Sequence, residues 1–89
     1  MGFSATWLSL REPADHAARD AALLTAAAGA AGASPVIVDL GCGTGSTIRA
    51  FGRHLRKPAA WRLLDNDPDL LKLAARATED DVTTHQIDL

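Results

Sequence analysis

A glycine loop with the sequence GCGTG occupies residues 41–45 and directly follows a short apolar run. Glycine lets the backbone turn sharply and approach a ligand closely, and a helix starting after the loop would present free N–H groups to that ligand. Asp65 follows a second apolar run, 20 residues after Gly45. A carboxylate at that spacing can accept hydrogen bonds from the two hydroxyls of a ribose. The loop alone fits a structural turn, but together with Asp65 it predicts a site for a nucleoside-containing cofactor.

The spacing of the glycines separates two classes of cofactor. The dinucleotide fingerprint G-x-G-x-x-G places glycine or alanine at position 46, whereas this chain has Ser46 and its third glycine at position 45. Asp39, two residues before the loop, adds a negative charge that disfavours a pyrophosphate and favours a cationic ligand with an amino group. The residues therefore favour a sulfonium amino-acid cofactor, and an NAD-type Rossmann fragment is the less favoured alternative.

The elements around the loop follow an alternating order. Residues 36–40 (VIVDL) form a continuous apolar run between Pro35 and the loop, which is typical of a strand buried on both faces of a parallel sheet. After the loop, Ile48, Phe51 and Leu55 recur at helical spacing and predict a helix with one buried face.

The second half of the chain repeats this order. Residues 61–64 predict a second strand, Asp67 and Pro68 predict the start of a helix that reaches residue 77, and residues 82–89 predict a third strand. Connections this long exclude hairpins, so the strands should be parallel with right-handed crossovers. The predicted class is α/β, a Rossmann-like βαβαβ unit with three parallel strands.

Two helices are expected before the sheet. Ser4 is a suitable N-cap for a helix over residues 3–11, with Phe3 packing on Leu8 as a hydrophobic staple. Pro13 should break that helix and begin a second one.

The second helix should reach residue 28 or 31 and end at the glycines and proline of residues 29–35. The alanine-rich stretch 26–33 could also be a linker, but alanine is the best helix former, so helix is preferred. The pairs Asp15/Arg19 and His16/Asp20 should stabilise its start at i,i+4 spacing.

Composition removes several classes of function. The 89 residues are 47% hydrophobic and 22% charged, which is typical of one small globular domain. A net charge of −2 provides no overall attraction for a nucleic acid. A single cysteine cannot form an internal disulfide, and the N-terminus lacks the features of a signal peptide, so a cytoplasmic protein without membrane contact is expected.

Three segments resemble motifs of the class I S-adenosylmethionine (SAM)-dependent methyltransferases. Residues 36–45 (VIVDLGCGTG) are similar to the first motif of that family. Residues 63–68 (LLDNDP) resemble the segment whose acidic residue holds the ribose, and residues 86–89 (QIDL) resemble the end of the third strand, whose Asp meets the adenine amino group. The resemblance implies SAM as cofactor, S-adenosylhomocysteine as product and methyl transfer to an acceptor that the sequence does not identify.

The resemblance also implies roles for individual residues. Asp39 and the glycine loop would face the methionine part of the cofactor, Asp65 the ribose, and Asp88 with the Leu89 backbone the adenine. Asn66 stands where the family usually has an apolar side chain against the adenine ring. Arg11, at the expected joint between the two N-terminal helices, could pair with the cofactor's carboxylate. The predicted cofactor-binding residues are Arg11, Asp39, Gly41, Cys42, Gly43, Thr44, Gly45, Asp65, Asn66, Asp88 and Leu89.

Other reactive side chains predict less. Cys42 could be a nucleophile at a helix N-terminus, but no histidine is nearby in sequence, so a small packed residue is favoured. The three histidines share no metal-binding spacing; they are His16, His54 and His85. Four cations are expected on a solvated helix face rather than on a nucleic-acid phosphate: Arg49, Arg53, Arg56 and Lys57.

Residues 1–34 should form a helical segment that packs on the sheet or covers the cofactor, and residues 35–89 the SAM-binding half-domain. The resemblance implies a seven-stranded sheet in the complete domain, with the site for the methyl acceptor after the fourth strand. We therefore expect a truncated fragment with an incomplete sheet, inactive by itself, whose first strand is an exposed edge. Such an edge favours self-association or pairing with a missing C-terminal half. A non-enzymatic interaction module that keeps the fold is the alternative.

Overall fold

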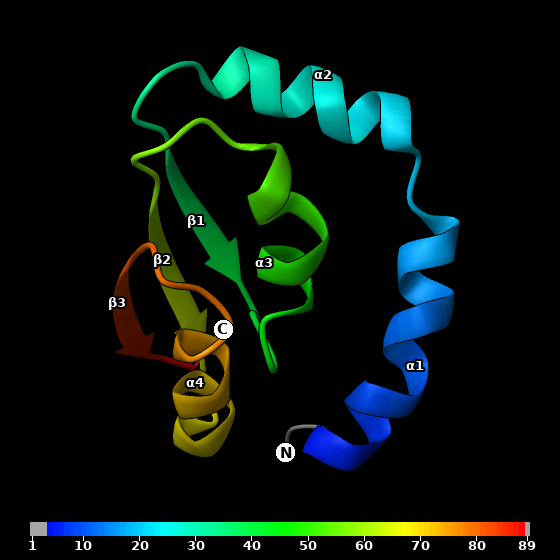
Figure 1. The fold of residues 1–89 in the computed structure, drawn as a ribbon. Helices are drawn as coiled ribbons and strands as arrows, with labels where there is room; N and C mark the ends of the chain where they lie inside the picture. The colour runs from blue at the N-terminus through cyan, green and yellow to red at the C-terminus, as the bar shows by residue number, and fades with distance from the viewer. Residues whose placement is uncertain (1–3, 89) are drawn as a thin grey trace.

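Two helices precede a βαβαβ unit in the computed structural model, which describes residues 4–88 (Figure 1). The three strands form one parallel sheet in the order β1-β2-β3, so the predicted α/β half-fold is confirmed. The elements are α1 (Ala5–Ala18), α2 (Ala21–Ala31), β1 (Val36–Leu40), α3 (Ser46–Phe51), the 3-10 helix η1 (Gly52–His54), β2 (Ala60–Asp65), α4 (Pro68–Ala75) and β3 (Asp81–Gln86).

Side-chain caps explain where two of the helices begin. The Asp67 carboxylate accepts hydrogen bonds from the N–H groups of Asp69 and Leu70, and Pro68 occupies the first turn of α4, as predicted. The Ser4 hydroxyl accepts from Trp7 N–H at the start of α1, which confirms that cap. The predicted staple involves Phe3, which lies outside the described residues.

The prediction that Pro13 breaks the first helix is wrong. Helix α1 continues through Pro13 to Ala18, because a proline removes one backbone hydrogen bond while the turns on either side keep theirs. The break falls at Asp20 instead. Its carboxylate accepts from the N–H groups of Ala22 and Leu23 and so caps α2.

Because α1 ends at Ala18, neither Arg19 nor Asp20 lies on the helix as the two predicted i,i+4 pairs require, and both pairs are wrong. Asp15 instead pairs with Arg11, and His16 lies beside Glu12, in each case four residues earlier in α1. The alanine-rich stretch is helical up to Ala31, where Gly32 ends α2 at φ 73°.

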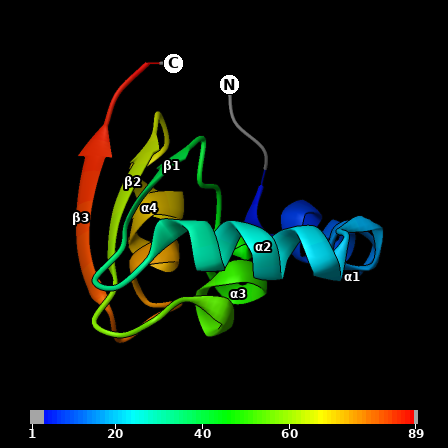
Figure 2. The ribbon, with the colours of Figure 1, turned by 90° about the horizontal axis from the view of Figure 1, so that it is seen from above.

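The helices lie on one side of the sheet (Figure 2). Trp61 and Leu63 of β2 point into this layer and are 1% and 0% exposed. Ile48 and Leu55, two of the three residues of the predicted apolar stripe, are buried in the same cluster, although α3 itself ends at Phe51 and continues as η1. The core therefore lies between β2 and the helices that follow β1 and β2.

Strand β1 is buried on one face only, so the cover on both faces that its apolar run predicted is absent within residues 4–88, and it lies at the edge of the three-stranded sheet, as expected. Ile37 packs against the core, but Val36, Val38 and Leu40 remain 56%, 54% and 66% exposed. The residues of β3 that lie in register with these three are polar: Asp81, Thr83 and His85. An apolar run predicts a strand, but the cover on its second face depends on elements beyond the run itself.

The amino ends of β2 and β3 are joined by a partly exposed polar contact. Asp80 Oδ2 accepts from Lys57 Nζ at 2.6 Å and from the buried Trp61 Nε1 at 3.1 Å. The hydrogen bond from Lys57 holds the pKa of the Asp80 carboxyl below its usual value. The contact fixes the end of the sheet opposite the glycine loop. None of the helices within residues 4–88 has the length and apolar character needed to cross a membrane.

Candidate cofactor site

The glycine loop carries β1 into α3 through three left-handed backbone positions. Gly41, Gly43 and Gly45 have φ values of 66°, 55° and 94°, a region that side-chain-bearing residues rarely adopt. The N–H groups of Gly41 and Cys42 donate to Leu64 O at 2.7 and 3.1 Å, which ties the loop to the end of β2. The predicted loop therefore exists and lies at the carboxyl edge of the sheet.

Asp65 ends β2 directly beside this loop. Its Oδ2 accepts from Gly43 N–H and its Oδ1 from Asp67 N–H, both at 3.0 Å, and the residue is 8% exposed. The carboxylate thus holds the glycine loop and the turn before α4 in place. Each carboxylate oxygen has a second lone pair, so hydroxyl donors of a ligand can still be accepted.

Asp39 brings a second carboxylate to the loop. Its Oδ2 is buried and makes no hydrogen bond to any described residue. Burial raises the pKa of this carboxyl, the charge of Asp65 raises it further, and Arg19 opposes both. A buried carboxylate oxygen without a partner is costly, and an ammonium group would satisfy it. The two carboxylates, which accept hydrogen bonds, therefore fit a cationic amino-acid ligand.

The ends of β2 and β3 meet at the same edge. Ile87 N–H donates to Asp65 O at 3.0 Å, so the segment after β3 lies against the end of β2. Asn66 and Asp88 are both exposed there. Leu89, whose backbone is predicted to meet the adenine, lies outside the described residues.

Helix α1 lies over the glycine loop and leaves little room beneath it. A cavity of about 110 Å³ separates the two and is lined by residues that include Leu8, Asp15 and Gly43. Ligand pockets are usually about 300–1,000 Å³, so a nucleoside cofactor requires α1 to move. The guanidinium of Arg11 lies 3.2 Å from Asp15 Oδ1, a residue that lines this cavity, and over the ring of Trp7. Its predicted contact with the cofactor stays a prediction.

Cys42 is 6% exposed within the loop. Burial, reinforced by the charges of Asp39 and Asp65, raises the pKa of its thiol to about 12. A thiol is nucleophilic as the thiolate, so the nucleophile alternative has no support and the packed small residue is favoured.

We expect Cys42 to react with iodoacetamide at pH 8 roughly a thousandfold more slowly than an ordinary thiol, because its pKa is raised from 9.0 to about 12. Mass spectrometry of timed samples measures the rate. The chain unfolded in guanidinium chloride serves as control and should regain the ordinary rate. Equal rates in both states would contradict the burial of this thiol.

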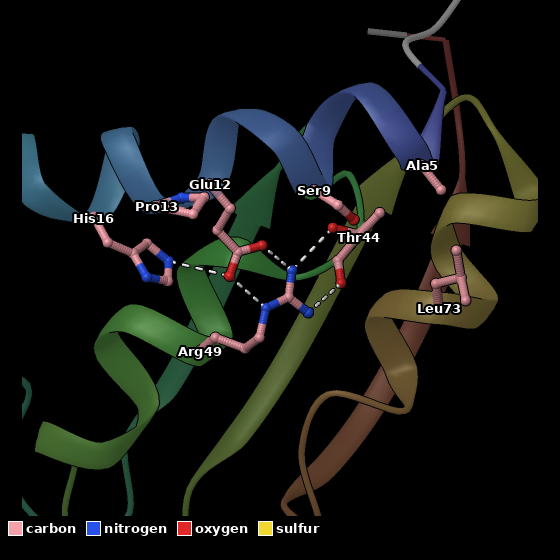
Figure 3. Close-up of a pocket in the computed structure, with 8 residues that line it drawn as sticks. All are labelled: Ala5, Ser9, Glu12, Pro13, His16, Thr44, Arg49 and Leu73. Atoms are coloured by element: carbon pink, nitrogen blue, oxygen red, sulfur yellow. Dashed lines mark hydrogen bonds and ion pairs between the residues drawn. The ribbon is translucent and has the colours of Figure 1, made fainter.

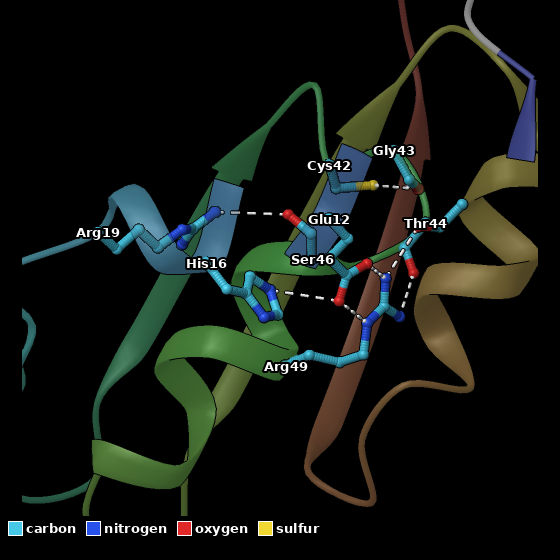
Figure 4. A network of polar contacts seen from close by, with 8 residues as sticks. All are labelled: Glu12, His16, Arg19, Cys42, Gly43, Thr44, Ser46 and Arg49. Atoms are coloured by element: carbon cyan, nitrogen blue, oxygen red, sulfur yellow. Dashed lines mark hydrogen bonds and ion pairs between the residues drawn. The ribbon is translucent and has the colours of Figure 1, made fainter. Parts of the chain in front are cut away.

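A polar network that the sequence did not predict joins α1 to the loop (Figure 4). Arg49 donates through Nε to Glu12 Oε2 at 2.6 Å and through Nη2 to Glu12 Oε1. It also donates to the Thr44 carbonyl and hydroxyl, each at 2.9 Å. Arg49 is exposed, as are Arg53 and Arg56, so the expected solvated face is present, but the pairing of Arg49 with Glu12 was not expected. Glu12 and Arg49 are 37 residues apart, so no local pattern indicates their contact.

Metal-binding residues do not gather in the described part of the chain. Within residues 4–88, no group of three or more His, Cys, Asp and Glu side chains is placed to hold a metal ion.

Comparison with known proteins gives two partial matches. A 53-residue stretch, 60% of the chain, is 38% identical to a carboxy-S-adenosyl-L-methionine synthase of Trichodesmium erythraeum and covers 21% of that protein. A 42-residue stretch, 47% of the chain, is 50% identical to the biotin biosynthesis bifunctional protein BioCD of Bordetella avium and covers 9% of it. These matches support a likeness to SAM-dependent methyltransferases over part of the chain. No family profile and no solved structure matches.

The matched stretches are short relative to the two relatives. The matches cover about a fifth of the first protein and about a tenth of the second. The matches therefore do not show the activity of a whole protein that contains this chain.

Proposed function

We propose that this chain is the cofactor-binding part of a SAM-dependent methyltransferase. The observation that carries the proposal is the pair of carboxylates at the glycine loop. Asp65 lies beside Gly43 of the loop, where its carboxylate can accept ribose hydroxyls, and Asp39 Oδ2 is buried without a hydrogen-bond partner among the described residues, suited to an ammonium group. The partial likeness to a carboxy-SAM synthase supports the same cofactor class.

Each part of the cofactor has a proposed partner. The Asp39 carboxylate accepts the amino group, and the loop N–H groups approach the methionine part. Asp65 accepts the ribose hydroxyls, while Asp88 and the Leu89 backbone meet the adenine beside Asn66. Arg11 pairs with the cofactor's carboxylate once α1 has moved. The cofactor supplies an electrophilic methyl group, and the chain's residues position it for an acceptor.

An NAD-type site is the competing proposal, and two residues disfavour it. Asp39 places a carboxylate, rather than a donor, beside the position of a pyrophosphate. Ser46 begins α3 at the place where the dinucleotide fingerprint has its third glycine. Direct binding measurements separate the two cofactors.

We expect isothermal titration calorimetry of the full chain to show binding of S-adenosylhomocysteine and none of NADH at the same concentrations. 5′-Methylthioadenosine, which lacks the amino-acid part, should bind at least about tenfold more weakly, because it cannot satisfy Asp39. Tighter binding of NADH, or no binding of S-adenosylhomocysteine, would contradict the proposed cofactor. Equal affinity for 5′-methylthioadenosine would contradict the role of Asp39.

A further inference from the structure

Arg49 presents an edge of its guanidinium that can bind a carboxylate. One side of its guanidinium is fixed by the carbonyl and hydroxyl oxygens of Thr44. The Nε and Nη2 groups on the other side hold both oxygens of Glu12, a bidentate geometry that carboxylates favour (Figure 3). The guanidinium is therefore held in position even without Glu12.

A cavity of about 590 Å³ adjoins this edge. Its volume lies in the usual range for small-molecule pockets, unlike the small cavity under α1 at the loop. Its lining combines the guanidinium of Arg49 with the polar side chains of Ser9 and His16 and the apolar side chain of Leu73. Such a lining suits a molecule with one anionic end and an apolar body.

Glu12 must leave Arg49 before a ligand can take its place. Its side chain is only 14% exposed and is held bidentately, so a ligand has to replace a strong ion pair, although none of the residues of α1 belongs to the buried core. His16 Nε2 lies 3.2 Å from Glu12 Oε2 and remains in the cavity lining as a second polar group. Glu12 thus occupies the place that a ligand's carboxylate would take.

We propose that this cavity binds a small organic carboxylate, whose carboxylate group pairs with Arg49 in place of Glu12. The site is not the proposed cofactor site, because Arg49 and Leu73 lie outside the residues assigned to the cofactor, but the two share Thr44 and the helix α1, so the test is made on the chain without cofactor. A carboxylate could also come from the amino-acid part of SAM, so the experiment separates the two sources.

The test uses benzoate as probe and the neutral benzamide as its matched control. Binding to the full chain is followed by chemical-shift changes in ¹H–¹⁵N NMR spectra. We expect benzoate, but not benzamide, to shift the signals of residues around the cavity. Shifts at His16, Arg49 and Leu73 would place benzoate in this cavity. Shifts confined to Asp39, Gly41 and Asp65, which would place benzoate in the cofactor site, or equal binding of benzamide, would overturn the proposal.

Variants distinguish a ligand site from a purely structural contact. Glu12→Gln removes the internal competitor, so benzoate should bind about fivefold more tightly. Glu79→Gln makes the same change at an exposed position and should leave the affinity unchanged. Arg49→Lys keeps the charge but loses the bidentate edge and should weaken binding at least about tenfold. No benzoate binding to Glu12→Gln, or no gain over the unmodified chain, would leave only a structural contact and refute the site.

Discussion

Replacing Asp65 with alanine should weaken binding of S-adenosylhomocysteine by roughly a hundredfold. Two hydrogen bonds from ribose hydroxyls to a carboxylate are lost, each worth about 1.5 kcal/mol net, so together about 3 kcal/mol or roughly a hundredfold. The residue is only 8% exposed, so water compensates poorly at this position. Calorimetric titration at one temperature and salt concentration measures the change.

The same substitution also removes a structural contact, which the control must separate. Asp65 accepts from the N–H groups of Gly43 and Asp67, so its loss destabilises the loop as well. Asp67→Ala removes the cap of α4 and costs about 1 kcal/mol of stability without touching the loop. Asp67→Ala should keep its affinity for the ligand when folded. If Asp65→Ala binds as tightly as the unmodified chain, the ribose assignment is wrong.

Local chemistry allowed much of this fold and site to be predicted. The caps at Ser4 and Asp67 and the glycine loop each depend on residues within a few positions, so their types alone indicate the structure. Asp65 lies beside the loop because parallel strands end at one edge of the sheet, although its hydrogen bond with Gly43 was not predicted.

The error at Pro13 is local, whereas the contacts that were not predicted depend on distant segments. Pro13 was expected to end a helix, yet the neighbouring turns and the cap at Asp20 place the break later. The pairing of Glu12 with Arg49 depends on how α1 docks on α3, which no sequence spacing encodes. The exposed face of β1 likewise depends on what else packs there. Self-association through this face, or its cover by a further segment, stays a prediction.

Gly45→Ala should lower the free energy of unfolding by about 2–4 kcal/mol, which is a large share of the total free energy of unfolding of a small domain. The residue has a φ of 94°, which an alanine adopts only under strain. An added Cβ would also lie 3.2 Å from Ala74 Cα and 3.1 Å from Ala77 Cβ. Because one of these contacts is helix backbone, α4 cannot yield by rotating a side chain.

Gly29→Ala is the matched control for this substitution, with unfolding in urea as the measurement. Gly29 lies inside α2, where an added Cβ meets nothing within 4 Å. Alanine there should stabilise the chain by about 0.5–1 kcal/mol, since glycine has the larger backbone entropy when unfolded. The two glycine substitutions should therefore have opposite signs. If Gly45→Ala lowers the free energy of unfolding no more than Gly29→Ala does, α4 does not pack closely on the loop. The position of the loop relative to Asp65 would then need another explanation.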